Sequence, residues 1–235
     1  MTLDAIAQRE LIEALRLLNG GQAAEAALIA SDVLGRYPQS VDAAHLLALC
    51  QKRLGNFDAA ITAFEAAQRL DPQNATITGN LANLLSQIGD RKQSVDTYLR
   101  ALELNPNSPE LLLNLGLTLI DEGKTEQAID ALTAAIKKND SVAALWHALG
   151  VALRIQGDLD QASAALERAI KLDPKSGKAW TALGVIARLR GNPELALQCY
   201  EQARRTGFAA DELLDAEASA YFDLGDTKTA IEKVD

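Results

Sequence analysis

Residues 143–176 read AALWHALGVALRIQGDLDQASAALERAIKLDPKS. Apolar residues recur at spacings of three and four on both sides of Gly157, a pattern typical of two amphipathic helices rather than strands. The glycine can adopt a positive φ and end the first helix, and Asp158 can cap the second. Because proline cannot continue a helix, the second helix is expected to end before Pro174. The stretch therefore predicts a helix hairpin.

The same pattern returns every 34 residues. Seven of the 15 glycines share one phase of this period: Gly21, Gly55, Gly89, Gly123, Gly157, Gly191 and Gly225. Framing from Ala7 gives the repeats 7–40, 41–74, 75–108, 109–142, 143–176 and 177–210 and a partial repeat 211–235. An Asn or Asp expected to act as an N-cap follows the glycine in five repeats: Asn56, Asp90, Asp158, Asn192 and Asp226. Residues 1–235 are therefore expected to form a single all-α domain.

Small residues occupy two more phases of the period, one on each helix of the hairpin. Gly150 and Gly184 belong to the first of these phases, and Ala60 and Ala162 belong to the second. Small side chains allow two helices to approach closely. We therefore expect these residues to lie where the two helices of a hairpin cross.

The composition excludes several classes of protein. Hydrophobic residues make up 48% and charged residues 23% of the chain, as in ordinary globular proteins. The formal charge of −9 disfavours nucleic acid as a partner. No stretch is apolar enough to insert into a membrane, and the first residues lack the features of an export signal, so a cytoplasmic location is expected.

Nothing in the sequence matches a catalytic motif. Phosphate loops, nucleophile elbows and the paired histidines of zinc proteases are missing, so we expect no catalytic residue, no metal site and no cofactor. His45 and His147 are isolated from each other. Cys50 and Cys199 are expected to be unpaired, small apolar fillers.

The repeat carries a family resemblance. It resembles the tetratricopeptide repeat most clearly through Trp146, Leu149, Gly150, Gly157, Ala162, Leu166, Ala169 and Pro174. The resemblance implies a right-handed superhelix, an α-solenoid of antiparallel hairpins, whose first helices line a groove that binds peptides or partner proteins. Carried over by position, the implied groove residues are His45, Lys52, Arg53, Asn80, Asn83, Asn114, Thr118, His147, Arg154, Lys178, Thr181 and Arg188.

Two pairs of these residues are separated by one repeat. Asn80 and Asn114 could stack and clamp a peptide backbone, which is similar to a short asparagine ladder in the repeat domain of O-linked N-acetylglucosamine transferases, or they are solvated polar residues. Arg154 and Arg188 could form a basic strip for a carboxylate or phosphate, or they pair with neighbouring acidic side chains.

Two functions remain open at this stage. The first is a scaffold or adaptor that binds a peptide or partner protein in the groove. The second is the substrate-recruiting arm of a larger enzyme, most plausibly a protein glycosyltransferase, whose catalytic domain lies outside these residues. The apolar residues Leu224, Ile231 and Val234 near the C-terminus favour a fragment of a longer chain, or else a homo-oligomer formed through the C-terminal end face.

Overall fold

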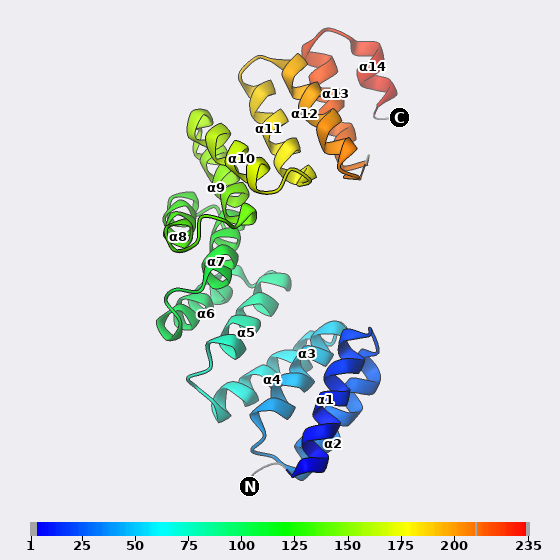
Figure 1. Cartoon of the computed structure of the whole chain (residues 1–235), viewed down its shortest axis with the longest axis vertical. Helices are drawn as coiled ribbons and strands as arrows, with labels where there is room; N and C mark the ends of the chain where they lie inside the picture. Colours follow the sequence, from blue (N-terminus) through cyan, green and yellow to red (C-terminus); the bar gives the residue numbers. More distant parts are fainter. Residues whose placement is uncertain (1–3, 210, 234–235) are drawn as a thin grey trace. The chain divides into compact units, whose positions relative to one another are not determined.

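The computed structural model describes residues 4–209 and 211–233, which form fourteen helices and no strands (Figure 1). The predicted all-α chain of helix hairpins with a 34-residue period is confirmed. The chain divides into two compact units, the first ending at Leu111 and the second beginning at Leu112. The prediction that residues 1–235 form a single domain stays a prediction.

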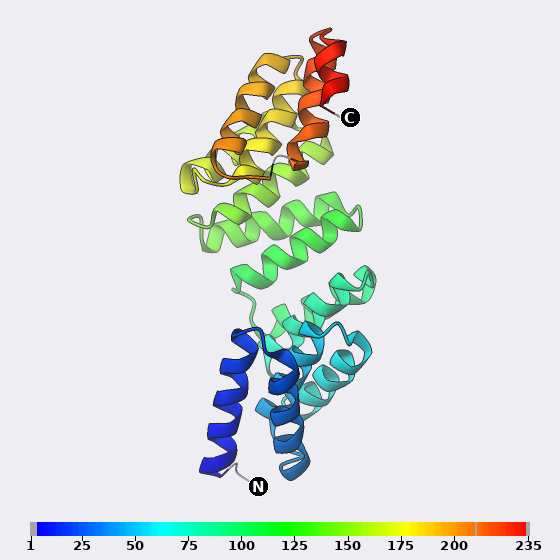
Figure 2. The same cartoon turned by 90° about the vertical axis from the view of Figure 1, so that its right-hand side faces the viewer.

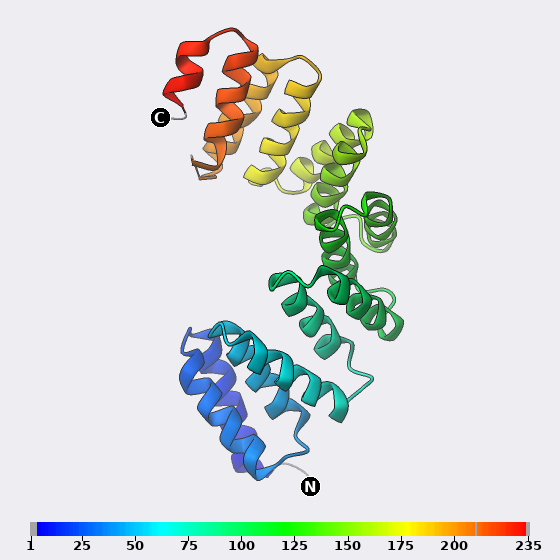
Figure 3. The ribbon, with the colours of Figure 1, turned by 180° about the vertical axis from the view of Figure 1, so that it is seen from behind.

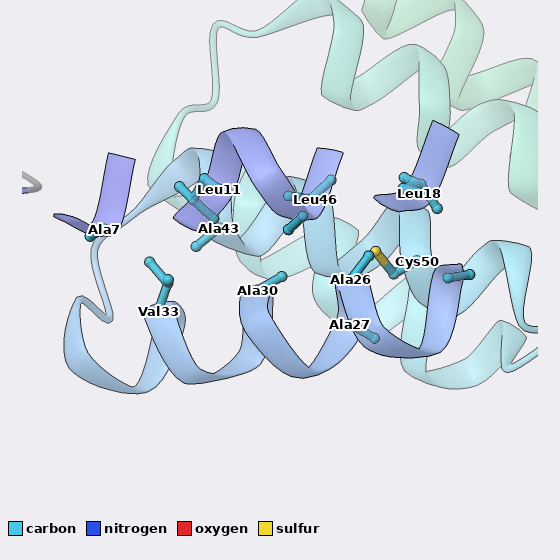
Figure 4. Close-up of a cluster of buried hydrophobic side chains, with 12 residues drawn as sticks. Ala7, Leu11, Leu18, Ala26, Ala27, Ala30, Val33, Ala43, Leu46 and Cys50 are labelled. Atoms are coloured by element: carbon cyan, nitrogen blue, oxygen red, sulfur yellow. The ribbon is translucent and has the colours of Figure 1, made fainter. Parts of the chain in front are cut away.

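The first unit contains three helix hairpins. Its helices are α1 (Ala5–Asn19), α2 (Ala23–Arg36), α3 (Val41–Arg53), α4 (Phe57–Leu70), α5 (Ala75–Gln87) and α6 (Arg91–Leu104). Each helix packs against the next one in sequence, and α1 also contacts α3 directly (Figure 2). Figure 4 shows the core where α1, α2 and α3 meet, with Leu11 and Leu46 among its side chains.

The second unit continues the same pattern. Helix α7 (Pro109–Asp121) crosses the boundary, and it is followed by α8 (Thr125–Lys138), α9 (Ala143–Gln156), α10 (Leu159–Leu172), α11 (Gly177–Leu189), α12 (Pro193–Arg205), α13 (Asp211–Asp223) and α14 (Thr227–Glu232). Successive helices from α8 onward pack against each other, and the last two hairpins are shown in yellow to red in Figure 3. Helix α11 also contacts both α9 and α13.

The turns within the hairpins follow the sequence prediction with one exception. All seven periodic glycines have a positive φ, between 75° and 95°, which is a conformation that other residues rarely adopt. The side chains of Asp90, Asp158, Asn192 and Asp226 accept hydrogen bonds from backbone N–H groups at the start of the following helix. The cap prediction is wrong for Asn56, whose Nδ2 donates to Oε1 of Gln51 at 2.8 Å instead.

The small residues lie where the helices cross, as expected. Ala60 and Ala162 are 0% exposed. A Cβ atom on Gly150 would lie 2.6 Å from Cγ of Leu166, and one on Gly184 would lie 2.4 Å from Cε1 of Tyr200. Because these distances leave no room for a methyl group, glycine sets the distance between the helices in both hairpins.

Both cysteines are buried and form no disulfide. Burial raises the pKa of the Cys50 thiol to about 11 and also raises that of Cys199. The thiolate is the reactive form of cysteine, so neither side chain is activated as a nucleophile.

Candidate functional site

The first helices of successive hairpins share one face in each unit. Helix α1 contacts α3 in the first unit, while α11 contacts α9 and α13 in the second. We call the exposed side of these helices the first-helix face. Each unit has a hollow on this face, and the predicted groove residues can be placed relative to these hollows.

The hollow of the second unit gathers four predicted residues, and we call it the basic pocket. Its volume is about 370 Å³. It is lined by His147, Val151 and Arg154 of α9, by Lys178, Thr181, Ala182 and Val185 of α11, and by Phe208 and Glu212. The repeat period brings the polar residues together, because equivalent positions on α9 and α11 project from the same side.

The basic pocket contains the cationic side chains of Arg154 and Lys178 and the carboxylate of Glu212. Arg154 is half-buried, whereas Lys178 and Glu212 are exposed. Burial and the positive charge of Lys178 both lower the pKa of His147, so its imidazole is neutral near pH 7. The surplus of positive charge suits a carboxylate or a similar anion.

Arg188 lies outside the basic pocket, and Thr181 lies inside it but bonds to its own helix. Nη1 of Arg188 donates to Oδ2 of Asp223 at 3.2 Å, and Arg188 lines a different hollow beside Phe222 and Ile231. The alternative of pairing with a neighbouring carboxylate therefore describes Arg188. Within the basic pocket, Oγ1 of Thr181 donates to the carbonyl oxygen of Gly177 at 2.9 Å.

Thr118 and Asn114 are joined through the backbone of α7. Oγ1 of Thr118 donates to the carbonyl oxygen of Asn114 at 2.9 Å, and Thr118 is only 2% exposed. Thr118 is therefore buried, and its predicted place in the groove stays a prediction. Asn80 and Asn114 lie in different units, so their stacking stays a prediction.

Three of the polar residues predicted in the first unit, His45, Asn80 and Asn83, form hydrogen bonds within that unit. Nδ2 of Asn80 donates to Nε2 of His45 at 2.9 Å, which links α5 to α3. Oδ1 of Asn83 accepts a hydrogen bond from the hydroxyl of Tyr98. These amides stabilise the packing of the first unit, in addition to any contact with a partner.

The first unit has a larger hollow that sequence reasoning missed. Two adjoining hollows of about 590 and 500 Å³ lie over α1 and α3 and share Leu15 and Leu49. Together we call them the trough. It is lined by Gln8, Leu11, Ile12, Leu15, Leu18 and Asn19 of α1, by Asp42, His45, Leu46, Leu49, Lys52 and Arg53 of α3, and by Gln87. Of these residues, only His45, Lys52 and Arg53 were predicted.

The C-terminal hairpin also exposes apolar side chains. Leu224 is 40% exposed and Ile231 is 56% exposed, while Val234 lies outside the described residues. Ile231 and Phe222 line a hollow of about 560 Å³ with Arg188. A homo-oligomer formed through this end face stays a prediction.

The described residues contain neither a cluster of metal ligands nor a membrane span. Over residues 4–209 and 211–233, no cluster of three His, Cys, Asp or Glu side chains has the arrangement of a metal site. Within that range, none of the helices combines the length and the apolar character that crossing a membrane requires.

The two histidines make stability depend on pH. Burial lowers the pKa of both His45 and His147 in the folded chain, and the attraction of Asp42 offsets this only partly at His45. Below the unfolded pKa of about 6.5 the unfolded chain therefore binds more protons, so the free energy of unfolding should fall as the pH is lowered from about 7. Urea unfolding followed by circular dichroism at a series of pH values measures this slope.

The matched control for this measurement is the double variant His45→Gln/His147→Gln. Its stability between about pH 7 and 5.5 should depend less on pH than that of the natural chain. An equal slope in both proteins would show that other groups are responsible.

Comparisons with known proteins agree with the repeat architecture. A family model described as "Cilia and flagella-associated protein 70 C-terminal domain" matches residues 72–234, and one described as "Tetratricopeptide repeat" matches residues 11–75. No curated protein matches the chain in sequence. The predicted likeness to O-linked N-acetylglucosamine transferases therefore finds no support.

Several solved structures are similar to this chain. A tetratricopeptide repeat protein from Parabacteroides merdae has a TM-score of 0.82 and 16% identity, over 97% of this chain and 90% of that one. MamA has a TM-score of 0.63 and 25% identity, over 68% of this chain and 94% of that one. YrrB, described as a "TPR protein with an unusual peptide-binding site", has a TM-score of 0.61 and 20% identity, over 75% of this chain and 91% of that one.

Proposed function

This chain belongs to the tetratricopeptide-repeat family, within the group described as the cilia and flagella-associated protein 70 C-terminal domain, and we propose that it is a scaffold that binds an extended, acidic segment of a partner protein in its basic pocket. The observation that carries this proposal is the convergence of Arg154, Lys178 and His147 on one hollow of the second unit. YrrB supports peptide binding as a use of this architecture.

The chemistry of the pocket identifies the kind of segment. The planar guanidinium of Arg154 can donate two parallel hydrogen bonds to a carboxylate, and the ammonium of Lys178 adds a second positive charge. Val151, Val185 and Phe208 supply an apolar wall beside these cations. An extended segment with a Glu or Asp next to an apolar residue satisfies both parts of the pocket.

The proposal is tested with two ten-residue fluorescent peptides. One alternates glutamate with leucine, and the other alternates glutamine with leucine. The glutamate peptide should bind the natural chain at least about tenfold more tightly, because charge-assisted hydrogen bonds contribute about 1.5–3 kcal/mol each. The double variant Arg154→Gln/Lys178→Gln should lose this preference in fluorescence anisotropy titrations.

A matched control removes two positive charges elsewhere. Lys171 and Lys175 are exposed and do not line the basic pocket, so the variant Lys171→Gln/Lys175→Gln should bind the glutamate peptide nearly as the natural chain does. Conversely, Glu212→Gln should tighten binding several-fold, since it removes the carboxylate that repels the ligand. Equal binding of the two peptides by the natural chain would refute the proposal.

A further inference from the structure

The trough of the first unit is an apolar surface that the described residues leave uncovered. Leu11 and Leu46 form its floor and are 8% and 7% exposed; Figure 4 shows their side chains close together between α1 and α3. Ile12 and Leu15 are 69% and 47% exposed along its wall. A partner that covers both side chains removes this apolar surface from water, which favours binding.

The two ends of the trough carry opposite charges. Asp42 lies in the first turn of α3, and Lys52 and Arg53 lie in its last turn. Lys52 lies ten positions after Asp42 in the sequence. At 1.5 Å per helical residue, this corresponds to about 15 Å.

These three charges are available to a partner. The ion pairs among the described residues involve none of the three side chains. Burial lowers the pKa of the Lys52 ammonium, which means that the charged form is poorly solvated there. A carboxylate placed beside Lys52 would relieve that cost.

A helix fits this surface better than an extended segment. The backbone N–H and C=O groups of an extended segment would face Ile12, Leu15 and Leu49, which offer no hydrogen bonds. A helix satisfies its own backbone and presents apolar side chains at spacings of three, four and seven residues, as helices bound in grooves do. About ten residues, or three turns, span the 15 Å between the charged ends.

We propose that the trough binds one amphipathic helix of a partner protein, lying antiparallel to α3, with acidic residues in its first turn beside Lys52 and Arg53 and basic residues in its last turn beside Asp42. The direction follows from the helix macrodipole, which favours acidic residues at the N-terminus and basic residues at the C-terminus of the bound helix. When the bound helix is antiparallel to α3, its acidic first turn lies beside Lys52 and Arg53, and its basic last turn lies beside Asp42. The inference rests on the proposed scaffold function, and it names the partner class of the first unit.

The experiment uses two helix-stapled, fluorescent 14-residue peptides of identical composition. Both carry leucines along one face. The first has glutamates in its first turn and lysines in its last turn, and the second has these charges exchanged. The natural chain should bind the first peptide at least about tenfold more tightly than the second. The variant Lys52→Glu/Arg53→Glu should weaken binding of the first peptide and strengthen binding of the second.

An apolar pair of variants tests the trough itself. Leu15→Ser should weaken binding of the first peptide about tenfold, which corresponds to about 1.4 kcal/mol. Leu28→Ser is the matched control, because Leu28 is 74% exposed on α2 and lines neither hollow of the trough. Circular dichroism should show that every variant remains folded, since each replaced side chain is exposed or half-buried.

The outcomes distinguish this inference from the proposed function. The variant Arg154→Gln/Lys178→Gln should bind the stapled peptide as the natural chain does, because it changes only the second unit. If the natural chain binds neither stapled peptide, or binds both equally, the inference is wrong even where the basic pocket binds its acidic peptide. Loss of binding in Leu28→Ser as large as in Leu15→Ser would also overturn it.

Discussion

Replacing Phe64 with alanine is expected to lower the free energy of unfolding of the first unit by about 3–5 kcal/mol. The ring is 0% exposed in the core formed by α3, α4 and α5, and its centroid lies 5.9 Å from that of the His45 imidazole. The same core includes the small residues Ala44 and Ala48, which cannot extend to fill the space that the ring leaves. The cost therefore includes a cavity as well as lost apolar burial.

Urea unfolding followed by circular dichroism measures this loss. Phe64→Leu is the control, because leucine is apolar and keeps much of the volume, and it should cost well under half as much as alanine. Equal stability of the two variants would show that the core of α3, α4 and α5 collapses around the smaller side chain. That result would contradict the close packing of this core.

The fold could be predicted from the sequence because its signals are local. A glycine at a positive φ ends one helix, and the N-cap residue after it begins the next helix. Each turn can therefore be predicted from the residues of the turn itself. Asn56 shows the limit of this reasoning. Its Nδ2 donates to Oε1 of Gln51, five residues earlier, and the sequence does not indicate whether the side chain is oriented for this bond or for a cap.

The candidate site could be predicted only in part, because its side chains interact across repeats. The period correctly placed Arg154, Lys178 and His147 on one face. It could not show that Arg188 pairs with Asp223, which lies 35 residues away, since such a pair depends on how two side chains are oriented in space.

The trough was missed for a different reason. Helix α1 carries apolar residues on two faces, with Leu11 and Leu18 in the core and Ile12 and Leu15 exposed. Periodicity alone assigns all four to a buried surface. The sequence signal that could have revealed the trough is the total width of the apolar surface of α1. This surface is broader than one neighbouring helix can cover.

Replacing Leu166 with alanine is expected to cost about 2–5 kcal/mol in the second unit. Leu166 is 0% exposed, and a Cβ atom placed on Gly150 would lie 2.6 Å from its Cγ. The leucine thus occupies the space that the glycine leaves open on the facing helix. Urea unfolding of the natural chain and the variant gives the difference in free energy.

The contact between Gly150 and Leu166 also predicts a reversal of sign. In the natural chain, Gly150→Ala should destabilise, because the new methyl group collides with Leu166. In the Leu166→Ala background, the same change should stabilise the chain, since the methyl group enters the cavity and alanine favours a helix over glycine by about 1 kcal/mol.

The nearest atom to that methyl group outside Leu166 is the carbonyl oxygen of Ala162, at 3.2 Å, which must shift by a few tenths of an ångström. Ala48 shows that the backbone accepts alanine at this position of the repeat, because it is 0% exposed in the equivalent hairpin. The natural chain, Gly150→Ala, Leu166→Ala and the double variant form a double-mutant cycle. The coupling energy between the two substitutions should exceed about 1 kcal/mol. Additive effects would mean that Gly150 and Leu166 do not share one space, and that the distance between these helices has another cause.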